Sequence, residues 1–252
     1  MNDREKVRNY MASYRGIDGG NPNAPVWICG IEHGGKSDRG IPDISPEARP
    51  GSWTEEFKKE FPDFSSWPYH QKVAKLMVAL RRSKPGADPH GSVDGWRQYL
   101  AEELYVLEGE TFKLNLFPLA SPRDNDDKWF EDYGARIGMT IKDDYRALCR
   151  GARFDFLRGL REHHRPRLVL GTGRTYREDF AAAFGFAGRS CEQMDVRFGS
   201  ARRECFVYRD EDGTLVVCPF LGGRNGVNSH GLIWELSRLL RSELERTECR
   251  RV

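Results

Sequence analysis

Residues 25–35 read Pro-Val-Trp-Ile-Cys-Gly-Ile-Glu-His-Gly-Gly. The first five are a short apolar run, which is the pattern of a buried strand. The stretch that follows, 31–51, is rich in glycine and proline and poor in apolar residues. A loop of that length inside a compact domain is usually functional. The sequence therefore predicts an early buried strand whose carboxyl end carries a functional loop.

Further strands are predicted later in the chain, with helices between them. Apolar runs predict strands at 112–117 and 167–170, and a hairpin whose arms, 205–209 and 214–219, flank Glu-Asp-Gly. Helical spacing predicts helices near 3–14, 53–60, 69–83, 94–104, 143–164, 175–184 and 229–246. Strands that alternate with helices indicate an α/β fold. We expect one domain over residues 1–252, a three-layer sandwich with a central, mostly parallel four-stranded sheet and a hairpin strand at its edge.

Composition narrows the class of protein. The chain has 252 residues, 38% of them hydrophobic, and a formal net charge of +2, which excludes a wholly disordered chain. No apolar run approaches the roughly 18 residues that span a bilayer, and the charged N-terminus lacks a signal-peptide core, so a cytoplasmic protein is expected. The six cysteines form no C-x-x-C pair and the histidines do not cluster with them, so we expect no metal and no cofactor.

The basic residues are unevenly divided, with 30 arginines and 10 lysines. Arginine binds phosphate bidentately and stacks on bases, which suits nucleic-acid binding. A GC-rich genome would produce the same bias through its arginine codons. Composition leaves these two explanations open.

The ends of the predicted strands carry the polar residues. In open α/β sheets, ligands bind outside the carboxyl ends of the strands. Glu32 lies just beyond the first strand, where its carboxylate would orient or activate a water. The alternatives are a solvated loop glutamate or a cap for a nearby amide. Asn115 lies within an apolar strand, where asparagine is disfavoured. Its amide would read the edge of a base or would bind a neighbouring loop.

The last predicted helix begins in a polar loop. Ser229, or Asn228 beside it, is a suitable N-cap. Arg224, Asn225 and His230 crowd the same helix N-terminus, which would favour an anion. Simple capping of the helix needs only one of these residues.

One motif in the loop after the first predicted strand indicates a nucleotide-hydrolysing enzyme instead. Residues 30–37 satisfy the P-loop pattern G-x-x-x-x-G-K-[ST], with Lys36 and Ser37 at the lysine and hydroxyl positions. A P-loop continues into a helix, whereas residues 38–51 contain three prolines and two glycines. No later apolar strand ends in the aspartate that would support Mg²⁺. A P-loop NTPase is therefore the less favoured interpretation.

Taken in order, the strand-end motifs resemble those of the uracil-DNA glycosylase superfamily, and most nearly its single-strand-selective branch. The similarity lies in five segments that cover about residues 25–240: Val-Trp-Ile-Cys-Gly-Ile-Glu-His-Gly-Gly at 26–35, Arg-Gly-Ile-Pro at 39–42, Lys-Leu-Asn-Leu-Phe-Pro-Leu-Ala at 113–120, Leu-Val-Leu-Gly-Thr-Gly at 168–173, and Val-Val-Cys-Pro-Phe-Leu-Gly-Gly-Arg-Asn-Gly-Val-Asn-Ser-His-Gly at 216–231.

This resemblance implies a site that excises a base flipped out of single- or double-stranded DNA, or binds a nucleotide-like ligand. It implies that Glu32 activates water or stabilises charge, and that Asn115 binds the base. An aromatic residue would stack on the base: Phe57, Phe61 or Trp53. Leu221 or Arg224 would fill the gap in the stack. The remaining implied contacts to the base or the backbone come from Gly30, Gly34, Pro118, Cys218, Arg224, Asn225, Asn228 and Ser229.

Three positions depart from the family pattern. Glu32 stands where the family has asparagine or aspartate, and its extra methylene would displace the carboxylate by about an ångström or more. His33 replaces the proline of the first motif, and Cys218 replaces the histidine that stabilises the departing base anion. A neutral cysteine is a poor hydrogen-bond donor, so His33 or His230 would have to replace that histidine in space. Two functions follow: a base glycosylase that hydrolyses an N-glycosidic bond, or a non-catalytic module of the same fold that binds a base, a nucleotide or a protein.

Overall fold

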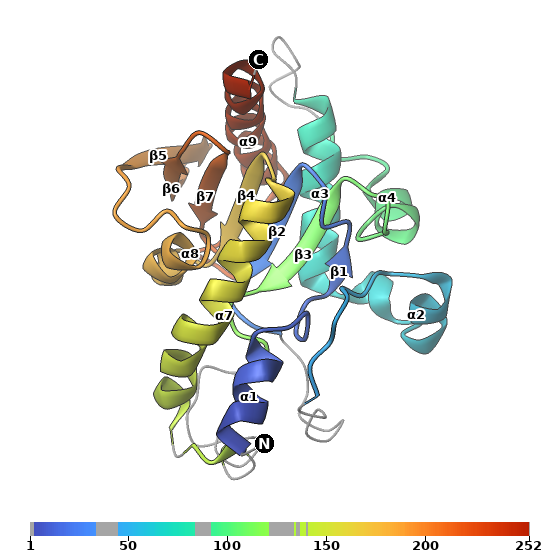
Figure 1. Cartoon of the computed structure of the whole chain (residues 1–252). Coiled ribbons are helices and arrows are strands. Elements are labelled where there is room, and N and C mark those ends of the chain that lie inside the picture. The colour runs from blue at the N-terminus through green and yellow to red at the C-terminus, as the bar shows by residue number, and fades with distance from the viewer. Residues whose placement is uncertain are drawn as a thin grey trace.

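A computed structural model describes residues 3–33, 45–83, 92–120, 134, 137–139 and 141–251. Its centre is a seven-stranded mixed sheet in the order β1-β3-β2-β4-β7-β6-β5 (Figure 1). The strands are β1 (Gly19–Gly20), β2 (Val26–Gly30), β3 (Thr111–Asn115), β4 (Leu168–Thr172), β5 (Cys191–Phe198), β6 (Ala201–Arg209) and β7 (Thr214–Cys218).

The α/β class is confirmed, and the sheet is wider than the sequence predicted. β3, β2, β4 and β7 run parallel to one another, while β1 pairs antiparallel with β3, and β6 and β5 continue the sheet antiparallel beyond β7. The predicted β6–β7 hairpin is present, with β7 central and buried. The prediction lacked β5, which is largely exposed and has no apolar run, and β1, which consists of two glycines with positive φ.

Helices cover both faces of the sheet. One face packs on α1 (Asp3–Met11), α7 (Lys142–His164) and α8 (Arg177–Ala183). The other packs on α3 (Pro68–Arg82), α4 (Trp96–Glu102) and α9 (His230–Arg251). The remaining short helices are α2 (Glu55–Glu60), η2 (Phe64–Ser66) and η4 (Arg174–Tyr176). Because both faces are covered, β2, β4 and β7 are apolar along nearly their whole length. β3 instead alternates its apolar residues with Thr111, Lys113 and Asn115.

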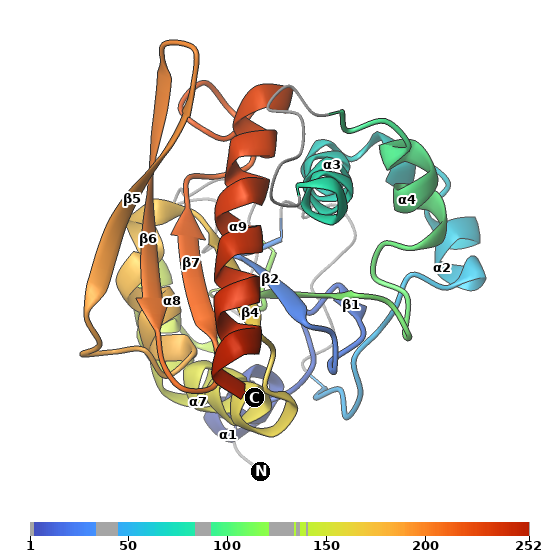
Figure 2. The same cartoon turned by 90° about the horizontal axis from the view of Figure 1, so that it is seen from above.

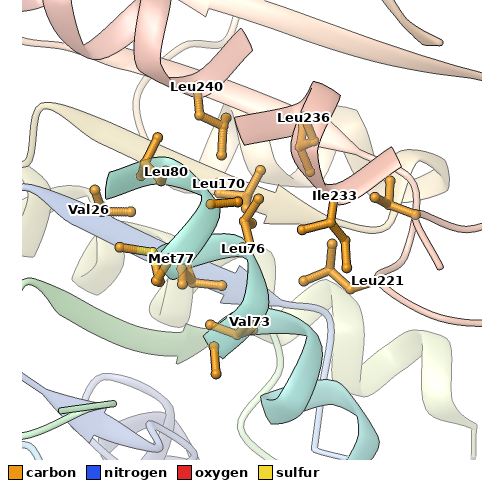
Figure 3. Close-up of a cluster of buried hydrophobic side chains, with 14 of the residues drawn as sticks. Val26, Val73, Leu76, Met77, Leu80, Leu170, Leu221, Ile233, Leu236 and Leu240 are labelled. Carbon is orange, nitrogen blue, oxygen red and sulfur yellow. The ribbon is translucent and has the colours of Figure 1, made fainter. Parts of the chain in front are cut away.

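The α3–α9 layer forms much of the core. Leucine, valine, isoleucine and methionine side chains of the two helices interdigitate above the sheet (Figure 3). Lys72, near the start of α3, donates to the Asn228 carbonyl just before α9, and Arg241 of α9 donates to the Leu80 carbonyl near the end of α3. The start of α3 therefore lies beside the start of α9, and the end of α3 lies beside a later turn of α9. Figure 2 views α3 nearly end-on and shows α9 next to it.

A buried arginine joins the opposite layer to the sheet. Arg153 of α7 is fully buried and donates to the backbone carbonyls of Met11, Ser13 and Asn115. One side chain thus connects the end of α1, the middle of α7 and the carboxyl end of β3.

Within the described part of the chain, no helix is long and apolar enough to cross a membrane.

Candidate functional site

The chain order places a topological switch point between β2 and β4. From β2 the chain crosses to β3 on one side, and it then returns to β4 on the other side of β2. Ligands of open α/β sheets bind in the crevice at such a point, outside the carboxyl ends of the strands. There the Thr172 hydroxyl donates to the Cys29 carbonyl at 3.3 Å and lies 3.0 Å from the hydroxyl of Tyr69 on α3. We take this edge of the sheet as the candidate site.

A buried polar cluster, here called the Asp18 cluster, lies beside it and consists of Asp18, His33, Lys113 and Asn115. The Lys113 ammonium is 3.0 Å from Asp18 Oδ2 and 2.7 Å from Asn115 Oδ1. His33 Nδ1 is 3.3 Å from Asp18 Oδ1, and its Nε2 is 3.2 Å from Asn115 Nδ2. Lys113 and Asn115 are two residues apart on β3, so their side chains share one face of the sheet.

Opposite charges stabilise this cluster. Burial opposes ionisation of Asp18, but the charge of Lys113, and after it that of His33, outweighs burial and holds the pKa of the carboxyl well below its usual range. Nearby, burial lowers the pKa of His70 to about 4, against the opposing effect of Asp18. His70 packs against Trp53, with 4.8 Å between ring centroids, and its Nδ1 is 3.3 Å from the Tyr105 hydroxyl.

The Asn115 amide is engaged by the protein at both ends. Its oxygen accepts from Lys113, and its nitrogen donates to the Gly16 carbonyl at 3.1 Å as well as facing the Asp18 cluster. Asn115 as a whole is only 1% exposed. Of the two roles open from the sequence, this geometry is that of the structural bond to a neighbouring loop. Pro118 is also buried, against Gly16.

Gly30 is a packing requirement of the same cluster. A Cβ at this position would lie 2.5 Å from Asn115 Oδ1 and 3.2 Å from Lys113 Nζ. A side chain is therefore excluded where β2 passes the cluster, and the strand ends close against the two polar groups.

Glu32 belongs to a different polar group. Its carboxylate is 2.9 Å from the ammonium of Lys142, the first residue of α7, whose side chain is fully buried. The Asp18 cluster lies under α3, since Lys113 also faces the Tyr69 ring at 5.3 Å. Among the described residues, the ion pair of Glu32 is with α7, whereas Asn115 belongs to the Asp18 cluster. His230 is an exposed residue at the start of α9.

The end of β7 presents an aromatic ring instead of a polar group. The Cys218 side chain is 0% exposed and lies in the α3–α9 core, where burial raises the pKa of its thiol well above the usual value. Phe220, two residues later, is 49% exposed. Its ring stacks on Tyr69 with 5.5 Å between centroids and 26° between planes. An open aromatic face therefore lies at the switch point.

The loop after β7 folds onto itself. The Ser229 hydroxyl accepts from the Leu232 amide at 3.2 Å, which confirms the predicted N-cap. The Asn228 side chain donates to the Gly223 carbonyl at 2.7 Å. Arg224 and Asn225 are exposed, whereas Leu221 is 1% exposed and belongs to the core. Phe220, not Leu221, is thus the large apolar side chain that this loop presents to solvent.

Phe57 lies on α2 and is joined to Tyr69 through intervening rings, those of Trp53 and His70. Its ring stacks on Trp53, with centroids 5.1 Å apart and planes 14° apart, and Trp53 in turn contacts His70. Among the described residues, no direct ring contact joins Phe57 to Tyr69 or Phe220. Gly34, Lys36 and Ser37 lie outside the described residues. Within those residues, no group of three metal-ligating side chains comes together.

Sequence reasoning missed Asp18, Tyr69, Lys113, Lys142 and Phe220. A signal existed for Lys113, because a lysine two residues from an asparagine in an apolar strand must share its buried face. Phe220 had no such signal, because the adjacent Leu221 is an equally apolar residue. Asp18, Tyr69 and Lys142 come close only through the tertiary fold, which no local pattern encodes.

Lys113→Met should destabilise the protein by about 3–5 kcal/mol, because it leaves the Asp18 carboxylate buried without its main counter-charge. The double variant Lys113→Met/Asp18→Asn should recover part of that loss. Urea unfolding followed by tryptophan fluorescence measures both. Lys58→Met, which removes a surface pair with Glu55, is the control and should cost less than about 1 kcal/mol. A double variant no more stable than the single one would contradict the assignment.

His70 should make the protein acid-sensitive. Its pKa is about 4 in the folded chain, below the usual 6.5, so the unfolded chain takes up the proton first as pH falls. The free energy of unfolding therefore keeps its full value above pH 6.5 as far as His70 is concerned. It falls between pH 6.5 and 4, by about 3 kcal/mol in total, as the unfolded chain binds the proton more readily than the folded one. His70→Phe should flatten this part of the pH profile of the unfolding free energy. An equally steep profile in the variant would assign the decline to another group.

No model of a known protein family matches this chain, and no curated protein is similar to it. The function must therefore be inferred from the residues at the switch point.

Proposed function

We propose that this chain is a nucleic-acid-binding domain with a uracil-DNA glycosylase-like fold, which binds an unstacked base at the carboxyl ends of β2, β4 and β7. The support for the fold is the order of the motifs along the sequence together with the parallel central strands and their switch point. The support for the ligand comes from the aromatic and charged residues around that point.

The exposed ring of Phe220 carries the proposal. One face of the ring stacks on Tyr69, whose hydroxyl is hydrogen-bonded to that of Thr172. The backbone of the residue is also held, because the Phe220 carbonyl accepts from the Val227 amide at 2.9 Å. A large apolar ring that is fixed on one side and open on the other is suited to base stacking, which is worth about 1–3 kcal/mol per base.

Binding without catalysis agrees best with the interior of the site. The Asn115 amide is already bonded to Lys113 and Gly16, and the Cys218 thiol lies in the core. Neither is placed to contact a base. The non-catalytic module is accordingly the first candidate.

A base glycosylase is the second candidate, and Glu32 favours it. This carboxylate follows β2 directly at the switch point and is held by Lys142. A positioned carboxylate can accept a proton from water as the water attacks the sugar carbon and the base departs. Glu32 separates the two candidates experimentally.

Phe220→Ala should weaken binding to a dye-labelled oligo-dT by roughly 5- to 150-fold, the equivalent of one lost base stack. Phe220→Trp should retain the affinity, because it retains the stacking face. Fluorescence anisotropy at low salt measures both variants. Leu107→Ala, which removes a side chain that is 57% exposed in another part of the surface, is the control. Equal affinity of Phe220→Ala and the unchanged protein would remove Phe220 from the site.

Glycosylase activity is tested by single-turnover incubation with labelled oligonucleotides that carry uracil, hypoxanthine, xanthine or oxidised pyrimidines. An active enzyme would leave alkali-labile sites that Glu32→Gln abolishes and that the exposed control Glu162→Gln leaves unchanged. We expect oligonucleotide binding without cleavage, as the engaged Asn115 amide predicts. Cleavage that depends on Glu32 would overturn that expectation and establish the second candidate.

A further inference from the structure

Three cations and a neighbouring histidine lie near Tyr69, the residue on which the Phe220 ring stacks. We call the set the α3 cationic group: Lys72, Lys75, Arg97 and, beside them, His230. They come from three elements, α3, the start of α4 and the start of α9. Figure 2 shows α3 lying between α9 and α4 on one face of the sheet. The group therefore forms along the first half of α3, next to the starts of α4 and α9.

Contacts with backbone and aromatic groups hold these side chains together. Lys72 donates to the Asn228 carbonyl at 2.6 Å. The Lys75 ammonium lies 4.5 Å from the centre of the Trp96 ring, and the Arg97 guanidinium carbon lies 4.6 Å from the centre of the same ring. Trp96 thus positions two cations on the surface.

The cations repel one another. Burial, then the charges of Lys72 and Arg97, lowers the pKa of Lys75. Burial, then Lys75 and Lys72, lowers the pKa of His230, while Asp94 acts in the opposite direction. In the part of the chain that the structure describes, neither of the two lysines nor Arg97 forms an ion pair with a carboxylate. Placing like charges together without counter-charges costs free energy, which a bound polyanion would recover.

Tyr69, which holds the Phe220 ring, is followed along α3 by Lys72 and Lys75. Lys72 is three residues from Tyr69 and Lys75 is three residues from Lys72, so each is a neighbour of the one before it, and the row turns by about 60° around the helix at each step. From Tyr69 to Lys75 the helix rises about 9 Å, or two to three nucleotide steps of about 3.4 Å. A base on Phe220 would therefore place the neighbouring phosphates of its strand near these lysines.

We infer that a single strand of nucleic acid runs along α3 towards α4, with one base stacked on Phe220 and its neighbouring phosphates bound by Lys72, Lys75 and Arg97. This inference rests on the proposed function and adds the path that the strand takes over the surface. Nucleic acid fits the surface better than an acidic polypeptide, because the cations continue directly from an open aromatic ring that offers a stacking face.

The salt dependence of binding tests the path. For single strands, the slope of log K against log salt concentration is about −0.7 for each neutralised phosphate. Lys75→Ala/Arg97→Ala should make the slope shallower by about 1.4 and weaken oligo-dT binding at low salt by at least about tenfold. Lys72→Ala should make it shallower by about 0.7. Anisotropy titrations over a series of salt concentrations give these slopes, and circular dichroism checks that the variants fold.

Three controls sharpen the assignment. Lys75→Arg keeps the charge and should keep the slope. Arg189→Ala removes an exposed arginine after α8, on the opposite layer, and should change nothing. Phe220→Ala should lower affinity with the slope unchanged, because a stacked ring neutralises no phosphate.

The failures are distinguishable. If the unchanged protein binds oligo-dT but the slope is the same in Lys75→Ala/Arg97→Ala and Lys72→Ala, the path is wrong and the proposed function stands. If the unchanged protein binds no oligonucleotide at low salt, both are wrong. If polyglutamate of equal charge competes as well as unlabelled oligo-dT, the group is a docking surface for an acidic protein, which also overturns the inference.

Discussion

The ion pair between Lys113 and Asp18 constrains the whole carboxyl edge of the sheet. Both groups are charged and largely removed from water, so each needs the other and every remaining polar contact around them must be satisfied. Asn115 supplies one of these contacts, and His33 supplies another. Gly30 has no side chain and so leaves room for the polar groups of Asn115 and Lys113. The end of β2, the end of β3 and the segment before β1 are thereby fixed against one another.

That constraint divides the site into an interior and a rim. The interior is filled by the protein's own hydrogen bonds, with the amide of Asn115 turned to its neighbours. The rim carries the open Phe220 ring and the α3 cationic group. A ligand on this rim meets a rigid surface and requires no rearrangement of buried charge. This arrangement suits recognition of a base and its strand, and it contrasts with a deep pocket built to hold a base beside a nucleophile.

The fold was largely predictable from the sequence, because the apolar runs of β2, β4 and β7 and the helical spacing of α3 and α9 are strong local signals. The two additional strands were not, since β1 is two glycines and β5 is mostly exposed. At the site, Ser229 was identified by capping chemistry, which is local. The partners of Asn115 and Glu32 were not identified, because Asp18 and Lys142 are distant in sequence and only the complete fold brings them close. Leu221 and Phe220 are adjacent apolar residues, and the sequence does not show which of them is buried.

Arg153 gives the N-terminal helix an importance that its position at the chain end conceals. Through three backbone carbonyls it joins the end of α1 to the last residue of β3. Energetic coupling between two places in a protein is reciprocal. A change that moves the Asn115 backbone would therefore reach the end of α1 through the Arg153 guanidinium, and a change at α1 would reach Asn115 by the same contacts. The N-terminal helix and the carboxyl end of β3 are therefore connected through one buried side chain.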